Sequence, residues 1–255
     1  MCERPLRPTG ALTLGCDSGH RFDANKRGYI TLLRSGSTKL VGDTPAMLDA
    51  RDAVLDQAGA FGPVAAAVAE AAVGPRIVDA GAGTGYYLRA TIARVVGADG
   101  LALDLSPDAV ARAVRSSDRI DGVVADTWRP LPLRDDVADT VLDIFAPRNL
   151  PEFHRILRAG GTLVVVVPRA DHLVELRQST AMLHIPGDKA EDVIASAGRW
   201  FGLSGRQHVT CEVTLDEGLA AALVGMGPSA RHDSSSTSTV AATTISVDVL
   251  QFSSR

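Results

Sequence analysis

The pattern of hydrophobic and polar positions changes early in the chain. Residues 1–42 are polar and Gly-rich, with short β-like runs at 11–14 and 29–33 and no helical period. Residues 44–72 then carry Ala, Leu and Val at helical spacing. Thr44 is suited to be the N-cap of that stretch, with Pro45 at the first helical position. We therefore expect a small N-terminal segment followed by a helical one.

From residue 76 onward, apolar strands and helical segments alternate. Strands are predicted at 77–80, 101–105, 123–125, 140–145 and 162–167, with helices between them at 86–96, 108–116 and 150–158. Continuous apolar strands separated by crossover helices indicate a parallel sheet covered on both faces.

The pattern changes again near the end of the chain. Residues 208–215 and 243–252 alternate as strands, with a helical segment at 216–225 between them. Two closing strands of this kind predict an antiparallel edge on the parallel sheet. The expected organisation is a module at 1–42, a helical linker at 43–74 and an α/β domain at 75–255.

Composition narrows the class of protein. The 255 residues suffice for one α/β domain and a small appendage, and 45% hydrophobic with 22% charged residues is typical of a globular protein. No apolar run reaches the roughly 18–20 residues that span a bilayer, and the start lacks a signal-peptide pattern. Three cysteines, Cys2, Cys16 and Cys211, cannot form a disulfide framework. We expect a cytoplasmic protein with no membrane partner.

Charge is unevenly distributed although the net charge is −4. Residues 1–42 hold seven Lys or Arg against three Asp or Glu, so the rest of the chain carries the excess negative charge. This asymmetry predicts that a polyanion would be bound by the N-terminal segment. A basic surface without a partner is the alternative.

A glycine loop, Asp79-Ala80-Gly81-Ala82-Gly83-Thr84-Gly85, follows one apolar strand and precedes a helix. Glycines allow a tight turn and a close approach of a ligand to the backbone. A glycine pattern alone is weak, because dinucleotide-binding domains use a similar one. Here the spacing is G-x-G-x-G, and Asp79 would repel a pyrophosphate but attract a cationic amino-acid moiety.

Two more acids follow the next strands. Asp104 ends the second strand and could accept hydrogen bonds from ribose hydroxyls, and Asp126 follows the third, where it could hold an adenine amino group. The carboxyl ends of successive strands are where open α/β sheets bind ligands. Each acid alone could equally be a helix cap or a turn residue.

This ordered set of acids and glycines resembles the class I, Rossmann-like methyltransferases, which have a seven-stranded sheet. The resemblance implies S-adenosyl-L-methionine as the cofactor. Such enzymes mainly align an already activated methyl group with its acceptor. The acceptor would lie near residues 145–149, which lack the Asn/Asp-Pro-Pro-Tyr pattern of enzymes that methylate exocyclic amines.

Cys2, Cys16 and His20 stand close together in the N-terminal segment. The Cys16-x3-His20 spacing suits a zinc site, although a closed structural site needs four ligands. A polar segment of this size could hardly bury enough core to fold without metal. Unrelated cysteines and a surface histidine are the alternative.

The segment resembles the zinc-ribbon-like module of the bacterial large-subunit rRNA guanine-N1 methyltransferases (RlmA-type), including the mycinamicin- and tylosin-resistance enzymes of macrolide producers. The similarity extends over essentially the whole chain. The residues that carry it are Phe22-Asp23, Gly28-Tyr29-Ile30-x-Leu32-Leu33, Gly42-Asp43-Thr44, Met47, Ala50-Arg51, Gly83-Thr84-Gly85-Tyr86-Tyr87, Ala146-Pro147 and His172-Leu173-x-Glu175-Leu176.

The resemblance implies methylation of N1 of one guanine, at the 748 position, in a 23S rRNA hairpin near the peptide exit tunnel, which would give resistance to mycinosylated macrolides. It also implies that Tyr86 and His172 join the cofactor site and that Cys2, Cys16 and His20 hold a structural Zn²⁺. In the family pattern a further Cys precedes Cys2, which would place the fourth ligand upstream of Met1. A homodimer is left open.

Other classes remain. One is a small-molecule methyltransferase that acts on a macrolide or polyketide, for which a basic module would have no use. Another is a nucleotide-sugar or NAD oxidoreductase, which the G-x-G-x-G spacing and the lack of a Tyr-x3-Lys pair disfavour. No side chain can be identified from the sequence as the base that removes the proton from guanine N1, although Asp143 and Asn149 lie in the expected region.

Overall fold

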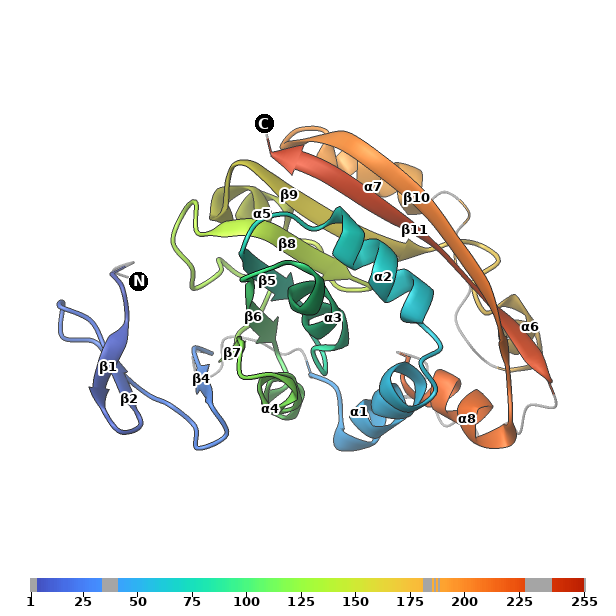
Figure 1. The fold of residues 1–255 in the computed structure, drawn as a ribbon, viewed down its shortest axis with the longest axis horizontal. Helices are drawn as coiled ribbons and strands as arrows, with labels where there is room; N and C mark the ends of the chain where they lie inside the picture. Colours follow the sequence, from blue (N-terminus) through green and yellow to red (C-terminus); the bar gives the residue numbers. More distant parts are fainter. Residues whose placement is uncertain are drawn as a thin grey trace.

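The computed structural model describes residues 4–33, 41–180, 185, 187, 189–227 and 240–254. Its strands form two sheets (Figure 1). The smaller is an antiparallel sheet of β1 (Arg7–Gly10), β2 (Thr13–Gly15) and β3 (Arg21–Asp23). The larger has eight strands in the order β10-β11-β9-β8-β5-β6-β7-β4.

The centre of the large sheet is parallel, as the sequence predicts. Its neighbours are paired in parallel throughout β7-β6-β5-β8-β9. These strands are β5 (Arg76–Ala80), β6 (Asp99–Asp104), β7 (Ile120–Val124), β8 (Ala138–Ile144) and β9 (Leu157–Pro168). Their chain order reverses at β5, between β6 and β8, which is the point where open α/β sheets bind ligands.

The closing strands form the predicted antiparallel edge. β11 (Ala242–Ser254) pairs antiparallel with both β9 and β10 (Phe201–Thr214). β10 begins at Phe201 rather than at residue 208. The sequence pattern missed this first part of the strand, because the segment after Phe201 is mostly exposed and shows no apolar alternation. Its pairing with β11, rather than its own pattern, makes it a strand.

The N-terminal segment contributes an eighth strand, where seven were predicted. β4 (Tyr29–Thr31) pairs in parallel with β7, with Tyr29 opposite Gly122. Gly122 permits this approach, since a Cβ there would lie 2.5–3.0 Å from the side chains of Val110, Val114 and Tyr29. The last part of the predicted module is therefore continuous with the central sheet, and the boundary at residue 42 stays a prediction.

Helices cover both faces of the sheet. The core on one face includes Val64 of α2 (Gly62–Ala71) and Leu88 of α3 (Tyr86–Arg94). The core on the other includes Phe153 of α5 (Leu150–Ile156) and Val193 of α7 (Lys189–Ala197). α4 (Pro107–Ser116) packs on β6 and β7. α7 and the short α6 (Val174–Ser179) were not predicted.

The predicted helical stretch at 44–72 is broken. α1 (Pro45–Asp52) begins as expected, because the Thr44 hydroxyl accepts a hydrogen bond from the Met47 N–H at 3.3 Å. A π-helical turn, η1 (Ala53–Gln57), follows, and the chain then turns through Gly59, which has a φ of 63°. α1 packs against α8 (Glu217–Gly225), so that both lie near one end of the sheet (Figure 1).

Within the described residues, no helix is both long enough and apolar enough to cross a membrane.

Candidate cofactor site

The glycine loop connects β5 to α3 at the point where the strand order reverses. The N–H groups of Gly81 and Ala82 both donate to the Leu103 carbonyl oxygen, at 2.8 and 3.0 Å, which holds the loop against β6. Gly81 has a φ of 94°, and a Cβ there would lie 2.6 Å from the Ala146 Cβ. Gly85, with a φ of 80°, is the N-cap of α3. The loop thus has the backbone that only glycines supply readily.

Asp79 lies at the end of β5 beneath this loop. It is 1% exposed, and neither carboxylate oxygen has a hydrogen-bond partner among the described residues. Burial raises the pKa of Asp79 to about 8, with a further contribution from the Asp104 charge. A buried carboxyl without a partner is costly for a folded protein. A cationic ligand group would provide the missing partner.

Asp104 ends β6 and contacts the loop directly. Its Oδ2 accepts from the Gly83 N–H at 2.9 Å, and its Oδ1 accepts from the Ser106 N–H at 2.8 Å. Burial raises its pKa, and these two bonds counteract the rise. A carboxylate has about four acceptor positions, so two remain for hydroxyl donors.

Asp126 follows β7 and is also buried. Its Oδ1 accepts from the Trp128 N–H at 3.0 Å, and its Oδ2 lies 4.0 Å from Nε of Arg129. The side chain therefore stabilises its own turn, which agrees with the alternative that Asp126 is a turn residue. The second oxygen still has acceptor capacity for an amino group.

His172 lies in an aromatic cluster rather than at the glycine loop itself. Its ring stacks on Phe145, with centroids 6.0 Å apart, and meets the edge of Phe61 at 6.0 Å. Nδ1 accepts from the Ser246 N–H at 3.2 Å, so Nε2 carries the proton of the neutral ring. Burial lowers the His172 pKa to about 4, with a smaller effect of Arg177.

Phe145 connects this cluster to the loop. It directly precedes Ala146, which contacts Gly81, and its ring lies 6.4 Å from that of Tyr87. Tyr86 packs edge-on against Tyr87 at 5.1 Å and opens α3. Phe145 has a φ of 55° and is 42% exposed. Phe145 lies in the segment 145–149 that was expected near the acceptor, but it was not predicted as a site residue.

Arg51 of α1 was also missed as a site residue, although it lies in a segment that carries the family resemblance. A Cβ on Gly83 would lie 3.0 Å from Nη1 of Arg51. Nη2 lies 2.8 Å from Oδ2 of Asp43 and donates to the Met226 carbonyl oxygen at 3.1 Å. The guanidinium group therefore covers the glycine loop.

Two residues were considered for the acceptor side. The Asn149 side-chain amide donates to the carbonyl oxygens of Thr127 and Arg129 at 2.9 and 3.1 Å, so it fixes the loop after β7. Asp143 on β8 is fully buried, and its carboxylate lacks a hydrogen-bond partner among the described residues. Burial raises its pKa well above the usual range, opposed by Arg148. Neither geometry identifies a base.

The predicted metal ligands are only partly described. Cys16 Sγ lies 3.3 Å from Nδ1 of His20, and the Cys16 N–H donates to the His20 carbonyl oxygen at 3.1 Å, which closes the turn. This fits adjacent zinc ligands, which stand about 3.6 Å apart in a tetrahedral site. Cys2 lies outside the described residues. No third Cys, His, Asp or Glu of the described chain joins the pair in a group that could hold a metal.

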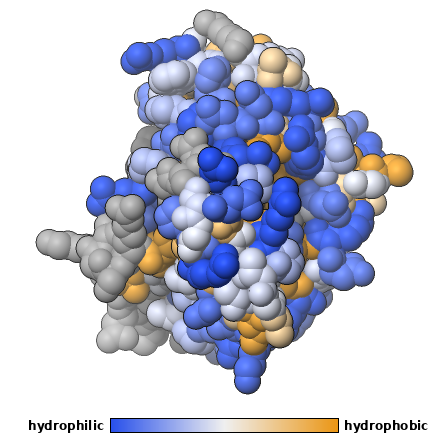
Figure 2. All heavy atoms as spheres, turned by 90° about the vertical axis from the view of Figure 1, so that its left-hand side faces the viewer, coloured by the Kyte–Doolittle hydropathy of each residue, from blue (hydrophilic) through white to orange (hydrophobic). Residues whose placement is uncertain are grey.

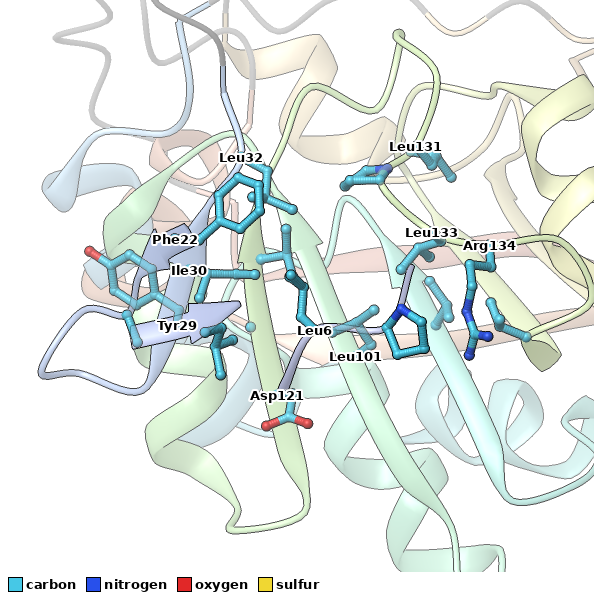
Figure 3. A pocket seen from close by; sticks show the side chains of 18 of the residues that line it. Leu6, Phe22, Tyr29, Ile30, Leu32, Leu101, Asp121, Leu131, Leu133 and Arg134 are labelled. Carbon is cyan, nitrogen blue, oxygen red and sulfur yellow. The ribbon is translucent and has the colours of Figure 1, made fainter. Parts of the chain in front are cut away.

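A large cavity lies elsewhere in the molecule. It has a volume of about 1150 Å³ and separates the N-terminal segment from the face of β5, β6 and β7 (Figure 3). Phe22 and Ile30 face Leu101 and Leu133 across it. Cys16 and His20 line this cavity, whereas none of the predicted cofactor residues does. On this side of the molecule the surface is mainly hydrophilic, with scattered hydrophobic patches (Figure 2).

The arrangement at the carboxyl ends of β5, β6 and β7 fits S-adenosyl-L-methionine. Asp79 is a buried acid with no cationic partner in the part of the chain that the structure describes, and the Gly81 position leaves no room for a side chain. Asp104 retains acceptor capacity beside the loop. These are the requirements of an amino-acid moiety joined to a ribose.

Comparisons with known proteins agree with this geometry. Residues 77–161 match the model of a methyltransferase domain family. The fold resembles a Bacillus halodurans C-125 protein provisionally described as a methyltransferase, with a TM-score of 0.51, 15% identity, and coverage of 74% of this chain and 97% of that one. A chain from the complex of the Haloferax volcanii Trm112 methyltransferase activator gives a TM-score of 0.54, with 22% identity and coverage of 80% and 92%. At these identities the structures show the fold alone.

Sequence relatives are more specific. The chain is 41% identical to a Streptomyces fradiae protein named 23S rRNA (guanine(748)-N(1))-methyltransferase, covering 91% of this chain and 84% of that protein. A Micromonospora griseorubida protein, provisionally named a 23S rRNA (guanine-N(1)-)-methyltransferase, is also 41% identical, with coverage of 91% and 85%. A similarly named Bacillus subtilis (strain 168) protein is 34% identical, with coverage of 70% and 66%. The chain therefore belongs to the family of 23S rRNA (guanine-N1-)-methyltransferases.

Proposed function

We propose that this protein transfers a methyl group from S-adenosyl-L-methionine to N1 of one guanine in a 23S rRNA hairpin. The observation that carries the proposal is the 41% identity to the Streptomyces fradiae protein, whose name specifies N1 of guanine 748. We assign the same nucleotide here, and with it resistance to mycinosylated macrolides. The reaction would take place in the cytoplasm, where 23S rRNA is made.

The cofactor would be held by residues from three strand ends. Asp79 would bind the ammonium group of the methionine moiety, and Asp104 the ribose hydroxyls. Asp126 would accept from the adenine amino group. The loop residues Gly81, Gly83, Gly85 and Tyr86 would form the surface beneath, and His172 would close the site through the Phe145 ring.

The proposed reaction is a direct transfer of one methyl group from sulfur to nitrogen. The cofactor supplies a methyl group that a positively charged sulfur has already activated. The N1–CH3 bond forms as the S–CH3 bond breaks, the bonding electron pair stays on sulfur, and the N1 proton passes to solvent or to a base. The chain's main contribution is alignment, which can supply a large part of the rate enhancement.

Two exposed aromatic rings are suited to receive the target base. Trp128 follows β7 and is 57% exposed, and Phe145 follows β8. Both stand on loops next to the cofactor residues Asp126 and Gly81. A hairpin base has to leave its stack before an enzyme can methylate it, and aromatic side chains then stabilise it by stacking.

The N-terminal segment would bind the RNA. Its basic side chains include Arg4, Arg7 and Lys26, which are all exposed. We also propose that Cys16, His20 and Cys2 hold a structural Zn²⁺. Cys16 and His20 stand at a distance that zinc ligands adopt, and the metal would stabilise a small sheet that has little core of its own.

The experiment that tests this function uses two RNA transcripts. One carries the hairpin around guanine 748, and its control has adenine in place of that guanine. Label from methyl-labelled cofactor should appear only in the first transcript, as 1-methylguanosine after digestion to nucleosides. A different methylated nucleoside, or equal labelling of both transcripts, would contradict the proposal.

A further inference from the structure

Arg51 lies at the glycine loop, and none of the cofactor contacts proposed above uses it. The cofactor's methionine moiety carries an ammonium group and a carboxylate. Asp79 and Asp104, which adjoin the glycine loop, are suited to the ammonium and the ribose, and in their ionised form both repel an anion. A carboxylate at this loop needs a positive charge. Arg51 brings such a charge to the loop.

The position of its guanidinium group is well defined. Nη1 lies over Gly83, the residue whose N–H donates to Asp104. Nη2 is held by Oδ2 of Asp43 at 2.8 Å and by the carbonyl oxygen of Met226 at 3.1 Å. The group is therefore fixed from α1, from the segment before it and from the end of α8.

One donor of this group is unused. Nε of Arg51 is buried and has no hydrogen-bond partner among the described residues. A buried donor without an acceptor is costly, and native structures rarely retain one without a reason. An anionic ligand group seated between Arg51 and the glycine loop would accept from it.

We propose that Arg51 binds the carboxylate of the cofactor's methionine moiety and so selects ligands that carry this group. The inference rests on the proposed use of S-adenosyl-L-methionine. It makes α1, which precedes the methyltransferase domain in the chain, a part of the cofactor site. The ammonium and the carboxylate are both bonded to the α-carbon of that moiety, so Asp79 and Arg51 together would fix its amino-acid end and thereby the direction of the methyl group.

The test compares two ligands by calorimetry. One is S-adenosylhomocysteine, and the other is its decarboxylated analogue, which keeps the ammonium group. The wild-type protein should prefer the first by roughly 10- to 100-fold, the range of a charge-assisted hydrogen bond. In Arg51→Gln, affinity for S-adenosylhomocysteine should fall by a similar factor. Affinity for the decarboxylated ligand should hardly change, so the preference disappears.

Arg112→Gln is the matched control. Arg112 of α4 pairs with Asp49 of α1 at 2.6 Å and with Asp52, so it holds the same helix without reaching the glycine loop. This variant should keep the wild-type preference between the ligands even if α1 is loosened. If Arg51→Gln does not fold, Arg51→Lys takes its place, with a smaller loss confined to the ligand with the carboxylate.

Equal losses for both ligands in the Arg51 variant would overturn the inference and leave Arg51 as an anchor of α1 and α8. An unaltered preference would overturn it as well. A wild-type protein that binds neither ligand would contradict the proposed cofactor itself, which is a different failure.

Discussion

Gly83 and Asp104 are joined by a hydrogen bond of 2.9 Å from the glycine's N–H to the carboxylate. This bond fixes the end of β6 against the loop that follows β5. The same carboxylate also accepts from the N–H of Ser106. Asp104 therefore orders the glycine loop, and in the proposed cofactor site its remaining acceptor positions would bind the ribose hydroxyls.

Replacing Asp104 by Ala should weaken binding of S-adenosylhomocysteine by roughly 10- to 100-fold, because hydrogen bonds to a charged group are lost. Asp99→Ala is the control, since Asp99 stands at the opposite, exposed end of β6. Calorimetry on both variants measures the effect. Similar affinities in the two variants would show that Asp104 has no part in the cofactor site.

Asp79 should make the stability of the cofactor-free protein depend on pH. Its folded-state pKa of about 8 lies above the ordinary 3.8, because burial disfavours the charged form. The folded protein thus binds more protons than the unfolded one between these values, and stability from this group falls as pH rises through that window. Asp79→Asn should therefore gain stability relative to wild type between pH 5 and pH 8.

Urea unfolding of both proteins at the two pH values checks this, since the difference between them cancels the other titrating groups. Binding of the cofactor should also improve with pH up to about 8 in the wild type only, because the ammonium group needs the ionised carboxyl. A difference in stability that is the same at both pH values would contradict the account.

The sequence predicted the parts of this fold that follow from local pattern. Strands β5 to β8 are short apolar runs, and Thr44 caps its helix as expected. β4 could be read as β-like, but not as a strand of the central sheet, because its partner β7 lies some ninety residues away. The first half of β10 has no apolar period, so only its pairing with β11 defines it.

The candidate site also combines residues that the local sequence pattern reveals with residues that only the folded structure brings together. Asp79, Asp104 and the glycines stand at positions that strand ends and loop spacing reveal. Arg51 and Phe145 could not be selected, since their roles depend on contacts made across the fold, to Met226 and to His172. His172 itself was taken from the resemblance, and the structure places it on Phe145. Its proposed place in the cofactor site stays a prediction, as do those of the other site residues.

Zinc content tests the proposed metal site. Protein purified with zinc should contain the metal, and both Cys16→Ser and His20→Ala should lose it, because each removes one of the proposed ligands. Cys211→Ser is the control, since Cys211 lies on β10 near the Ala60 carbonyl oxygen. Elemental analysis that finds no zinc in the wild-type protein would rule out the site.

Trp128 should act on the RNA rather than on the cofactor. Trp128→Ala should lower kcat/KM for the hairpin by roughly tenfold or more, in line with the loss of one base–aromatic stack. Trp128→Phe should restore most of this activity, because it retains an aromatic face. Affinity for S-adenosylhomocysteine should stay unchanged in both variants. A parallel fall in that affinity would instead place the ring against the adenine of the cofactor.

Mass mapping of intact 23S rRNA tests the central claim most directly. Unmodified rRNA is incubated with the protein and methyl-labelled S-adenosyl-L-methionine, with a macrolide present as a competing acceptor, and is then digested into fragments. The account predicts one added methyl group at N1 of guanine 748 and none on the macrolide. Label on the macrolide with none in the rRNA would contradict it and establish a small-molecule methyltransferase instead.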